Sequence, residues 1–227
     1  MTVERYNTIR EVLAKRQSDL TVLLEEVHKP HNVSAVYRSA DAVGVHKIHA
    51  VWAQNASLRK GTAMGSQIWV QTHTHNTLNN AIEHLHQQNM QVLVTHLDER
   101  AVDFRDIDYT KPTAIILGQE KTGATDEAVA LADHSVMVPM VGMVQSLNVS
   151  VAAALILYEA QRQRQAAGMY ETSQISEDDA QRVLFSGGFP VLYRECLRRK
   201  LSFPRVDENG CIDAPDQWWQ ALQFSKS

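Results

Sequence analysis

Short apolar runs alternate with segments of helical periodicity along most of this chain, and this alternation limits the possible folds more than any other feature. Continuous apolar runs of four to eight residues are typical of strands that are buried on both faces of a sheet. Strands that alternate with helices predict an α/β fold with a mostly parallel sheet and flanking helices. The expected strands are residues 20–27, 47–52, 69–72, 90–95, 113–117 and 135–138.

Helical patterns fill much of the remaining chain and suggest its division. We expect helices at residues 32–44, 79–88, 148–168, 176–185 and 190–200, and residues 1–16 carry one apolar helical face. These patterns predict an N-terminal helical extension over residues 1–18, an α/β domain over residues 19–168, and a C-terminal helical extension over residues 169–227.

A short segment occurs twice. Asn32-Val33-Ser34 follows the first apolar run, and Asn148-Val149-Ser150 follows a loop that is mostly apolar. Asn is a favoured N-cap, so each copy is expected to begin a helix after a strand, and such crossings often hold the ligands of α/β proteins. Because capping by Asn is common, the similarity of the two segments can also be a coincidence. The apolar loop at residues 138–148 is harder to explain by solvent exposure alone.

Charge is unevenly distributed, although the formal net charge is only -4. Residues 98–133 hold nine acidic and four basic side chains, whereas residues 161–205 hold eight basic and five acidic ones. The basic C-terminal part is a possible footprint for phosphates, and a solvated helix face explains the same charges equally well.

Cysteine usage and hydropathy indicate the cellular compartment. Cys196 and Cys211 lack metal-type spacing and do not suggest a disulfide framework. No apolar run reaches membrane-spanning length, and the first residues do not resemble a secretory signal. We therefore expect a cytoplasmic protein that does not enter a membrane.

Several common catalytic patterns are missing. The loop at residues 118–125 nearly spells a phosphate-binding P-loop, but Ala124 stands where its Lys belongs and Glu120 would repel a triphosphate. The pairs His28 with His31 and His73 with His75 lack carboxylate or thiolate neighbours, so no metal site is expected. The absence of a G-x-S-x-G elbow argues against a hydrolase.

Three motifs in order resemble a known family. Asn32 with Arg38, then residues 117–123 (Leu-Gly-Gln-Glu-Lys-Thr-Gly), then residues 138–150 are similar to the motifs of the SpoU branch of SPOUT RNA methyltransferases. The N-terminal helix, residues 158–164 and the C-terminal extension look like the TrmH-type members that methylate the 2'-hydroxyl of guanosine-18 in tRNA. The resemblance covers nearly the whole chain, and three ordered motifs are more specific than any one.

The resemblance implies a fold and a cofactor that periodicity does not show. The C-terminal part of the sheet domain would be threaded into a deep trefoil knot, which is very rare among proteins. The loops of this knot would bind S-adenosyl-L-methionine, with main-chain groups holding the adenine. The pocket-lining positions carried over from the family are Thr95, Gly118, Val138, Met140 and Leu147.

The resemblance also implies catalytic roles and a homodimer. Arg38 would lie near the reacting nucleotide, and because Arg is a poor base we expect it to hold a phosphate and stabilise alkoxide charge. Asn32, Ser146 and Asn148 would orient ligand and ribose. Glu120 would brace its loop or pair with a cation such as Arg38 of a second subunit.

The basic extensions are expected to hold RNA phosphates and give affinity rather than base choice. Two alternatives stay open: the same chemistry on rRNA or on another tRNA nucleotide, and a non-catalytic RNA-binding protein on this fold. The expected RNA contacts are Arg162, Arg164, Arg198, Arg199 and Lys200.

Overall fold

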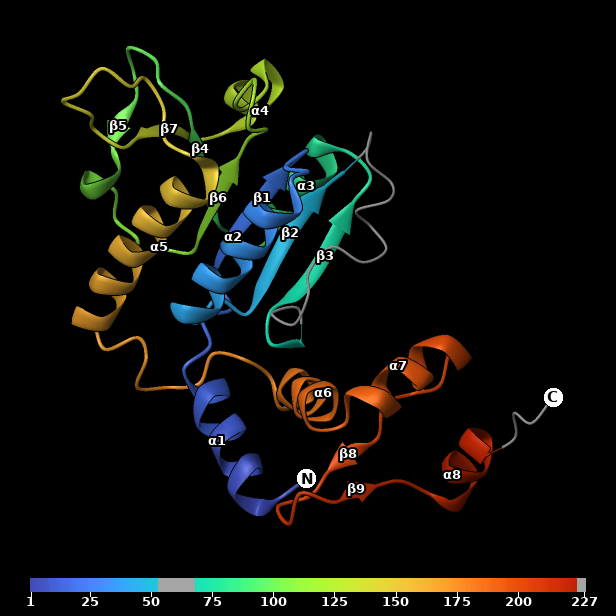
Figure 1. Ribbon diagram of the computed structural model, residues 1–227. Helices are drawn as coiled ribbons and strands as arrows, with labels where there is room; N and C mark the ends of the chain where they lie inside the picture. The colour runs from blue at the N-terminus through green and yellow to red at the C-terminus, as the bar shows by residue number, and fades with distance from the viewer. Residues whose placement is uncertain (53–67, 224–227) are drawn as a thin grey trace. The chain divides into compact units, whose positions relative to one another are not determined.

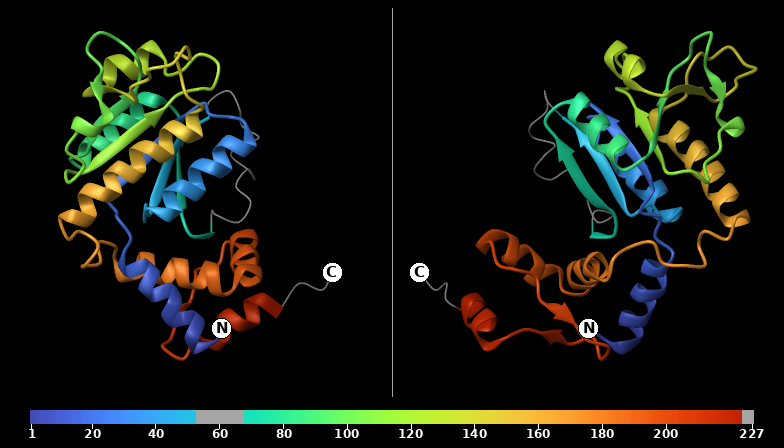
Figure 2. Two further views of the ribbon diagram at one scale, coloured as in Figure 1. Left: turned by 60° about the vertical axis from the view of Figure 1, so that its left-hand side comes forward. Right: turned by 180° about the vertical axis from the view of Figure 1, so that it is seen from behind.

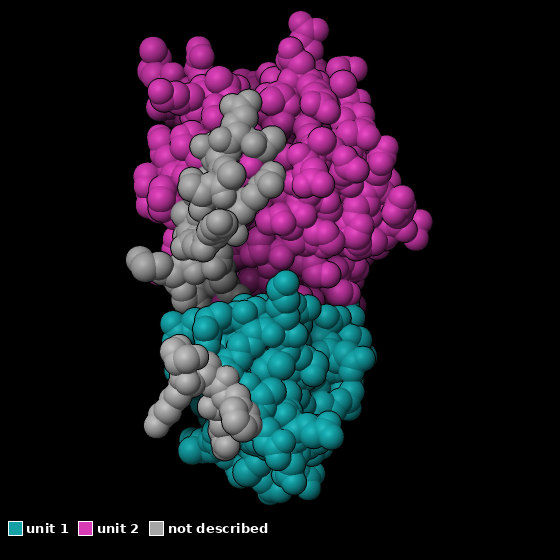
Figure 3. All heavy atoms as spheres, turned by 90° about the vertical axis from the view of Figure 1, so that its right-hand side faces the viewer, with its two compact units in different colours: residues 1–16, 172–227 teal, residues 17–171 magenta. Residues whose placement is uncertain are grey.

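The computed structural model describes residues 1–52 and 68–223, and the chain divides into two compact units, which Figure 3 colours separately. One unit is residues 17–171, and the other joins residues 1–16 to residues 172–227. The segments expected as two terminal extensions thus fall in one unit. Residues 59–66, a polar stretch of the sequence that holds Gly61 and Gly65, lie outside the described residues.

The larger unit is built on a seven-stranded sheet with the order β3-β2-β1-β6-β4-β7-β5 (Figure 1). Every pairing in this sheet is parallel, which confirms the expected α/β class. The central strands β1, β6 and β4 carry runs of buried residues because helices cover both faces. The strands are β1 (Leu20–Glu25), β2 (Lys47–Val51), β3 (Gln71–His75), β4 (Gln91–Thr95), β5 (Val102–Asp103), β6 (Thr113–Leu117) and β7 (His134–Met137).

Helices α2 (Pro30–Ala42) and α5 (Val149–Ala166) pack against one another on one face of the sheet, and α3 (Leu78–Gln87) and α4 (Asp126–Leu131) pack against the other (Figures 1 and 2). Alternate residues of a strand point to opposite faces. Ile115 and Leu117 therefore join the core under α2 and α5, whereas Ala114 and Ile116 join the core under α3.

Three local features of this unit differ from the sequence prediction. The third strand was expected at residues 69–72 but lies at Gln71–His75, where pairing with β2 decides the register of a polar edge strand. The short elements α4 and β5 were not predicted, because a helix of six residues and a strand of two carry little periodicity.

The two Asn-Val-Ser copies do not begin their helices in the same way. Asn148 is the N-cap of α5, and its side chain accepts a hydrogen bond from Ser150 N at 2.8 Å. Helix α2 instead begins at Pro30, with Lys29 as N-cap and no capping side chain. The expected capping role of Asn32 is therefore wrong: Pro, whose φ is already helical, starts the helix two residues earlier and leaves the Asn32 amide for other partners.

The smaller unit combines helices from both ends of the chain. Helix α1 (Val3–Ala14) packs against α6 (Glu177–Gly188), and the N-terminal amine donates a hydrogen bond to Gly210 O at 2.7 Å. A group of aromatic rings around Phe185, which includes Phe203 and Trp218, forms its core. The remaining elements are α7 (Pro190–Arg199), β8 (Arg205–Val206), β9 (Ile212–Asp213) and α8 (Asp216–Gln223). No helix among the described residues is long and apolar enough to cross a membrane.

Candidate functional site

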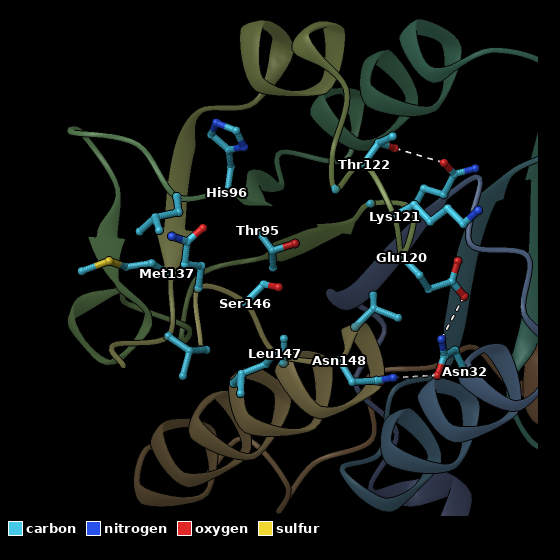
Figure 4. Close-up of a pocket in the computed structure, with 18 of the residues that line it drawn as sticks. Asn32, Thr95, His96, Glu120, Lys121, Thr122, Met137, Ser146, Leu147 and Asn148 are labelled. Carbon is cyan, nitrogen blue, oxygen red and sulfur yellow. Dashed lines mark hydrogen bonds between the residues drawn. The ribbon is translucent and has the colours of Figure 1, made fainter. Parts of the chain in front are cut away.

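A cavity of about 450 Å³ opens in the larger unit where β4, β6 and β7 end and where α2 and α5 begin. The carboxyl ends of parallel strands are where open α/β sheets bind their ligands. Its walls come from the loops at residues 118–123 and 136–148, from the end of β4, and from the first turns of the two helices. Figure 4 shows Asn32, Glu120 and Lys121 on one side of the cavity and Met137 and His96 on the other.

The loop after β6 is folded tightly on itself. Gly123 N donates to Gln119 O at 2.8 Å, and Gly123 has a φ of +73°, a conformation that favours glycine. A Cβ on Gly118 would lie 2.1 Å from Ala124 N, so the loop can close only with glycine there. The close approach at Gly118 is therefore made by the protein's own backbone.

Three polar side chains from three separate segments form a hydrogen-bonded chain at the cavity (Figure 4). Asn148 Nδ2 donates to Asn32 Oδ1 at 3.2 Å, and Asn32 Nδ2 donates to Glu120 Oε1 at 2.9 Å. The backbone N–H of Lys29 adds a second donor to Glu120 Oε1 at 3.2 Å. The first copy, the loop after β6 and the second copy are thereby joined in one site.

The Glu120 carboxylate is buried, with only 6% of its side chain exposed. Burial alone would raise its pKa, but the hydrogen bonds from the Asn32 amide and from backbone N–H groups outweigh burial and lower the pKa below the ordinary value. Among the described residues, Glu120 Oε2 accepts no hydrogen bond, and His28 Nδ1 lies 3.5 Å from it. The site therefore keeps a negative charge with one oxygen left to accept a donor.

The five positions expected to bind the cofactor all line this one cavity: Thr95, Gly118, Val138, Met140 and Leu147. Ser146 lines it as well, and Ile156 of α5 adds an apolar side chain that the sequence did not single out. Thr95 is held at the end of β4, where its hydroxyl donates to Ile116 O at 3.1 Å. The cavity thus combines apolar wall residues with polar side chains, as small-molecule sites usually do.

Arg38 does not line the cavity. It is exposed on α2 six residues after Asn32, which places it about 9 Å farther along the helix axis. Within one chain, Arg38 and Glu120 form no ion pair among the described residues, and Asn32 and Lys29 supply the donors to Glu120. One chain therefore does not bring Arg38 to the hydrogen-bonded chain of Asn148, Asn32 and Glu120.

Arg164 lies in the core and not on the surface that an RNA phosphate could reach. It is 0% exposed, and its guanidinium donates to the carbonyls of Tyr109, Asp19 and Lys111 and to the side chains of Gln17 and Asp19. The expectation that Arg164 contacts RNA is corrected by this burial. Charge periodicity could not reveal it, because Arg162, two residues earlier, is exposed.

The other expected RNA contacts are accessible to different degrees. Arg162 and Arg198 have 68% and 63% of their side chains exposed, and they pair with Glu159 and Glu195 of their own helices. Arg199 is 17% exposed and also pairs with Glu195, whose pKa falls to about 2 because of these two guanidinium groups. Lys200 is exposed at the end of α7.

Several cavity residues had no signal in the sequence beyond their place in or near a motif: Lys29, His96, Gln119, Lys121 and Gln145. Each is polar and stands in a loop that follows a strand, so residue type alone does not separate it from an ordinary loop residue. Only the folded arrangement of the loops identifies them as part of the site.

The geometry of the site agrees with the protein families and relatives that this chain resembles. A model described as the SpoU rRNA Methylase family matches residues 19–158, and a model described as SpoU, rRNA methylase, C-terminal matches residues 162–215. A tRNA (guanosine(18)-2'-O)-methyltransferase of Escherichia coli (strain K12) is 58% identical over 98% of this chain and 99% of that protein. The enzyme of the same name from Thermus thermophilus is 52% identical over 81% of this chain and 95% of that protein.

Two solved structures of similar proteins share this fold, and one of them holds a bound cofactor. The A. aeolicus TrmH/SpoU tRNA modifying enzyme aligns with a TM-score of 0.73 at 40% identity, over 79% of this chain and 92% of that one. The SpoU methyltransferase AviRb from Streptomyces viridochromogenes, in complex with the cofactor AdoMet, aligns with a TM-score of 0.57 at 29% identity, over 67% of this chain and 64% of that one. The matching family model, the identity to these relatives and the shared fold show that the chain belongs to the SpoU methyltransferase family.

Proposed function

We propose that this protein transfers a methyl group from S-adenosyl-L-methionine to the ribose 2'-hydroxyl of guanosine-18 in tRNA. The Escherichia coli relative that bears this activity in its name matches 98% of this chain, so the match includes both extensions. The single structural observation that carries the proposal is the hydrogen-bonded chain of Asn148, Asn32 and Glu120 in the wall of the cavity. A non-catalytic RNA-binding protein would have no need of a buried carboxylate held in this way.

The cavity suits S-adenosyl-L-methionine. Pockets for ligands of this size have volumes of roughly 300–1,000 Å³, and the cavity measures about 450 Å³. Val138, Met140 and Leu147 offer apolar surface to a flat ring, and the backbone of residues 118–123 and 136–140 offers hydrogen-bonding groups. When bound, this cofactor supplies an electrophilic methyl group on a sulfonium.

The chain's own residues must orient the ribose and make a very weak acid reactive. Asn32 and Asn148 are already locked by each other and by Glu120, so they can hold ligand and ribose without further ordering, and positioning of this kind contributes a large part of many rate enhancements. Because the ionised Glu120 carboxylate only accepts hydrogen bonds, the Asn32 amide must present its nitrogen to it. Arg38 of a second chain then contributes positive charge beside the phosphate and the developing alkoxide.

We further propose that the protein works as a homodimer. An exposed apolar stripe runs along α5 at i, i+4 and i+7 through Val151, Leu155 and Tyr158, with 47%, 41% and 52% of each residue exposed. Val141 and Met143, in the loop beside the cavity, are almost fully exposed. Apolar patches of this kind favour a protein partner, and a second chain also offers a way to bring an Arg38 to the site.

The trefoil knot of the SPOUT fold is part of the same proposal. In the sheet, β7 lies on one side of β4 and β6, and β1 lies on the other side. Helix α5 follows β7 in the chain, yet it packs against α2, which follows β1. The segment at residues 138–148 must therefore cross back past the ends of β4 and β6, beside the loop at residues 118–123 that lines the same cavity. This return path supports a threaded connection.

Cations in both units, most of them exposed, are proposed to hold the tRNA backbone. These are Arg162, Arg198, Arg199 and Lys200, since Arg164 is buried. Contacts to phosphates would give affinity without base choice. We also propose a cytoplasmic location, where tRNA is modified; Cys196 and Cys211 are both free thiols, which agrees with a reducing compartment.

The decisive experiment measures transfer of a labelled methyl group from S-adenosyl-L-methionine to unmodified tRNA, followed by mapping of the modified nucleotide. We expect one 2'-O-methyl group per tRNA, at guanosine-18. A matched tRNA that carries 2'-deoxyguanosine at position 18 should accept none, because it lacks the attacking hydroxyl. Transfer to rRNA but not to tRNA, or methylation of another nucleotide, would overturn the proposed target while leaving the chemistry intact.

A further inference from the structure

Four histidines from three elements meet on the face of the sheet that α3 covers, away from the methyl-transfer cavity. His49 of β2 lies directly opposite His73 of β3 in the parallel register, and His75 follows two residues later on the same face. His84 reaches them from α3, which packs against β2 and β3. The sequence offered only His73 and His75 as a close pair and predicted no metal site, because His49 and His84 are more distant in the chain.

Three of these side chains are close enough to share one ion. His49, His73 and His84 each offer a ring nitrogen, and these nitrogens all lie within 4.8 Å of one another. Nitrogens on one tetrahedral zinc ion lie about 3.3 Å apart when each bond is about 2.05 Å long. The exposed His73 and the half-buried His84 can close this difference by side-chain rotation, while His49 is buried and provides a fixed point.

The surroundings are those of a ligand site and not of a plain histidine stack. A separate cavity of about 360 Å³ opens here and is lined by polar residues, among them His73, His75, Glu83 and His84. It leaves space for an ion with a water or the Glu83 carboxylate as a fourth ligand. The walls contribute nitrogen and oxygen donors and almost no apolar surface, which disfavours an apolar ligand.

Two further side chains can hold the ligating rings in place. One ring nitrogen of His49, Nδ1, forms a hydrogen bond with His75 Nε2 at 2.8 Å, which leaves the other nitrogen of His49 for an ion. Gln88 lies 2.7 Å from His84 Nε2, and a half turn of its amide would present an oxygen to a His84 N–H. Partners of this kind orient most metal-binding histidines.

We propose that His49, His73 and His84 form a binding site for one divalent transition-metal cation of the zinc type, with His75 and Gln88 as positioning residues. Three imidazoles suit Zn²⁺, Cu²⁺ or Ni²⁺, whereas Mg²⁺ and Ca²⁺ require oxygen ligands. The ion ties the edge strand β3 to β2 and α3. Its role is structural, because none of its ligands lines the methyl-transfer cavity.

The test is a titration of the full-length protein with Zn²⁺ at neutral pH, with no polyhistidine tag present. We expect one Zn²⁺ per chain, a higher Tm with Zn²⁺ than without it, and a tetrahedral absorption spectrum when Co²⁺ replaces Zn²⁺. H73Q should weaken Zn²⁺ binding by at least about tenfold and abolish the shift in Tm. His73 is exposed, so the variant should fold, which far-ultraviolet circular dichroism checks.

H134Q is the matched control, because His134 is an exposed histidine of β7 outside the cluster. It should bind Zn²⁺ like the unchanged protein, and H84Q should behave like H73Q. Equal Zn²⁺ affinity in the unchanged protein, H73Q and H84Q would overturn the proposed ligands. Absence of saturable Zn²⁺ binding in the unchanged protein would overturn the site.

Discussion

Asn148 and Asn32 stand 116 residues apart in the chain, and Nδ2 of the first donates a hydrogen bond to Oδ1 of the second at 3.2 Å. Because the Asn32 oxygen accepts from Asn148, its amide nitrogen faces Glu120 and donates there at 2.9 Å. The orientation of each side chain thus depends on the next one. The two copies of Asn-Val-Ser are joined through their first residues.

Asn32→Ala should destabilise the fold and remove methyl transfer. The substitution leaves Glu120 and Asn148 without their shared partner, and a buried group that loses its hydrogen bond costs about 1–3 kcal/mol. Urea unfolding and a methyl-transfer assay measure the two effects. Asn79→Ala is the control, since Asn79 donates to Glu83 at 2.7 Å in an exposed pair, and its loss should cost no more than about 0.5 kcal/mol. Equal destabilisation by both variants would contradict the prediction.

Arg38→Ala should bind S-adenosyl-L-methionine nearly normally and lose transfer to tRNA. The side chain is exposed and does not line the cavity, so its loss should leave the cofactor affinity unchanged. Calorimetry with the cofactor and a single-turnover assay with tRNA separate binding from transfer. Arg38→Lys keeps the charge without the planar fork and should recover only part of the rate. Unchanged transfer by Arg38→Ala would remove this residue from the mechanism.

Arg162 and Arg164 should respond to substitution in opposite ways. Arg164→Ala leaves the Asp19 carboxylate and three backbone carbonyls without their guanidinium, and breaking a buried pair costs about 3–5 kcal/mol. Arg162→Ala removes an exposed side chain, so stability should change by less than about 0.5 kcal/mol while tRNA binding weakens. Chemical denaturation and filter binding test both variants. A mild effect of Arg164→Ala on stability would show that its buried network is dispensable.

Affinity for tRNA should fall steeply with salt, and the slope should depend on the end of α7. In Arg198→Gln with Lys200→Gln, the slope of log K against log salt should drop by about 0.7–0.9 for each phosphate that the double variant no longer neutralises. Arg105→Gln with Lys111→Gln removes the same charge from an acidic segment, where the two side chains are 58% and 66% exposed, and should leave the slope unchanged. The same slope in both double variants would favour a merely solvated helix face.

The stability of the protein should respond to acid through Glu120. Hydrogen bonds lower the folded-state pKa of Glu120 below its ordinary value of 4.5, so ionised Glu120 stabilises the fold above pH 4.5. That contribution should be lost as the pH falls from 4.5 through the lowered pKa. Glu120→Gln does not titrate, and its free energy of unfolding should fall less over the same pH range. Parallel stability curves for the two proteins, from urea unfolding, would show that Glu120 does not contribute to this loss.

Most of the sheet and much of the cavity could be anticipated from local patterns. Buried strands such as Thr113–Leu117 are continuous apolar runs, and they appeared where the pattern predicted. The polar edge strand Gln71–His75 did not, because its limits depend on pairing with β2 and not on its own residues. The cavity positions, Thr95 and Leu147 among them, came from resemblance to a family, and the geometry then placed them together.

The alternation of apolar runs and helical segments by itself determined the parallel α/β architecture, and the three ordered motifs identified the family. Only the tertiary structure decided that Asn32 serves Glu120 and not a helix start, that Arg164 lies in the core while Arg162 faces solvent, and that four scattered histidines meet. The physical reason is the same in each case. A periodic pattern reports on residues a few positions apart, whereas burial and hydrogen-bond partners depend on segments that are distant in the chain.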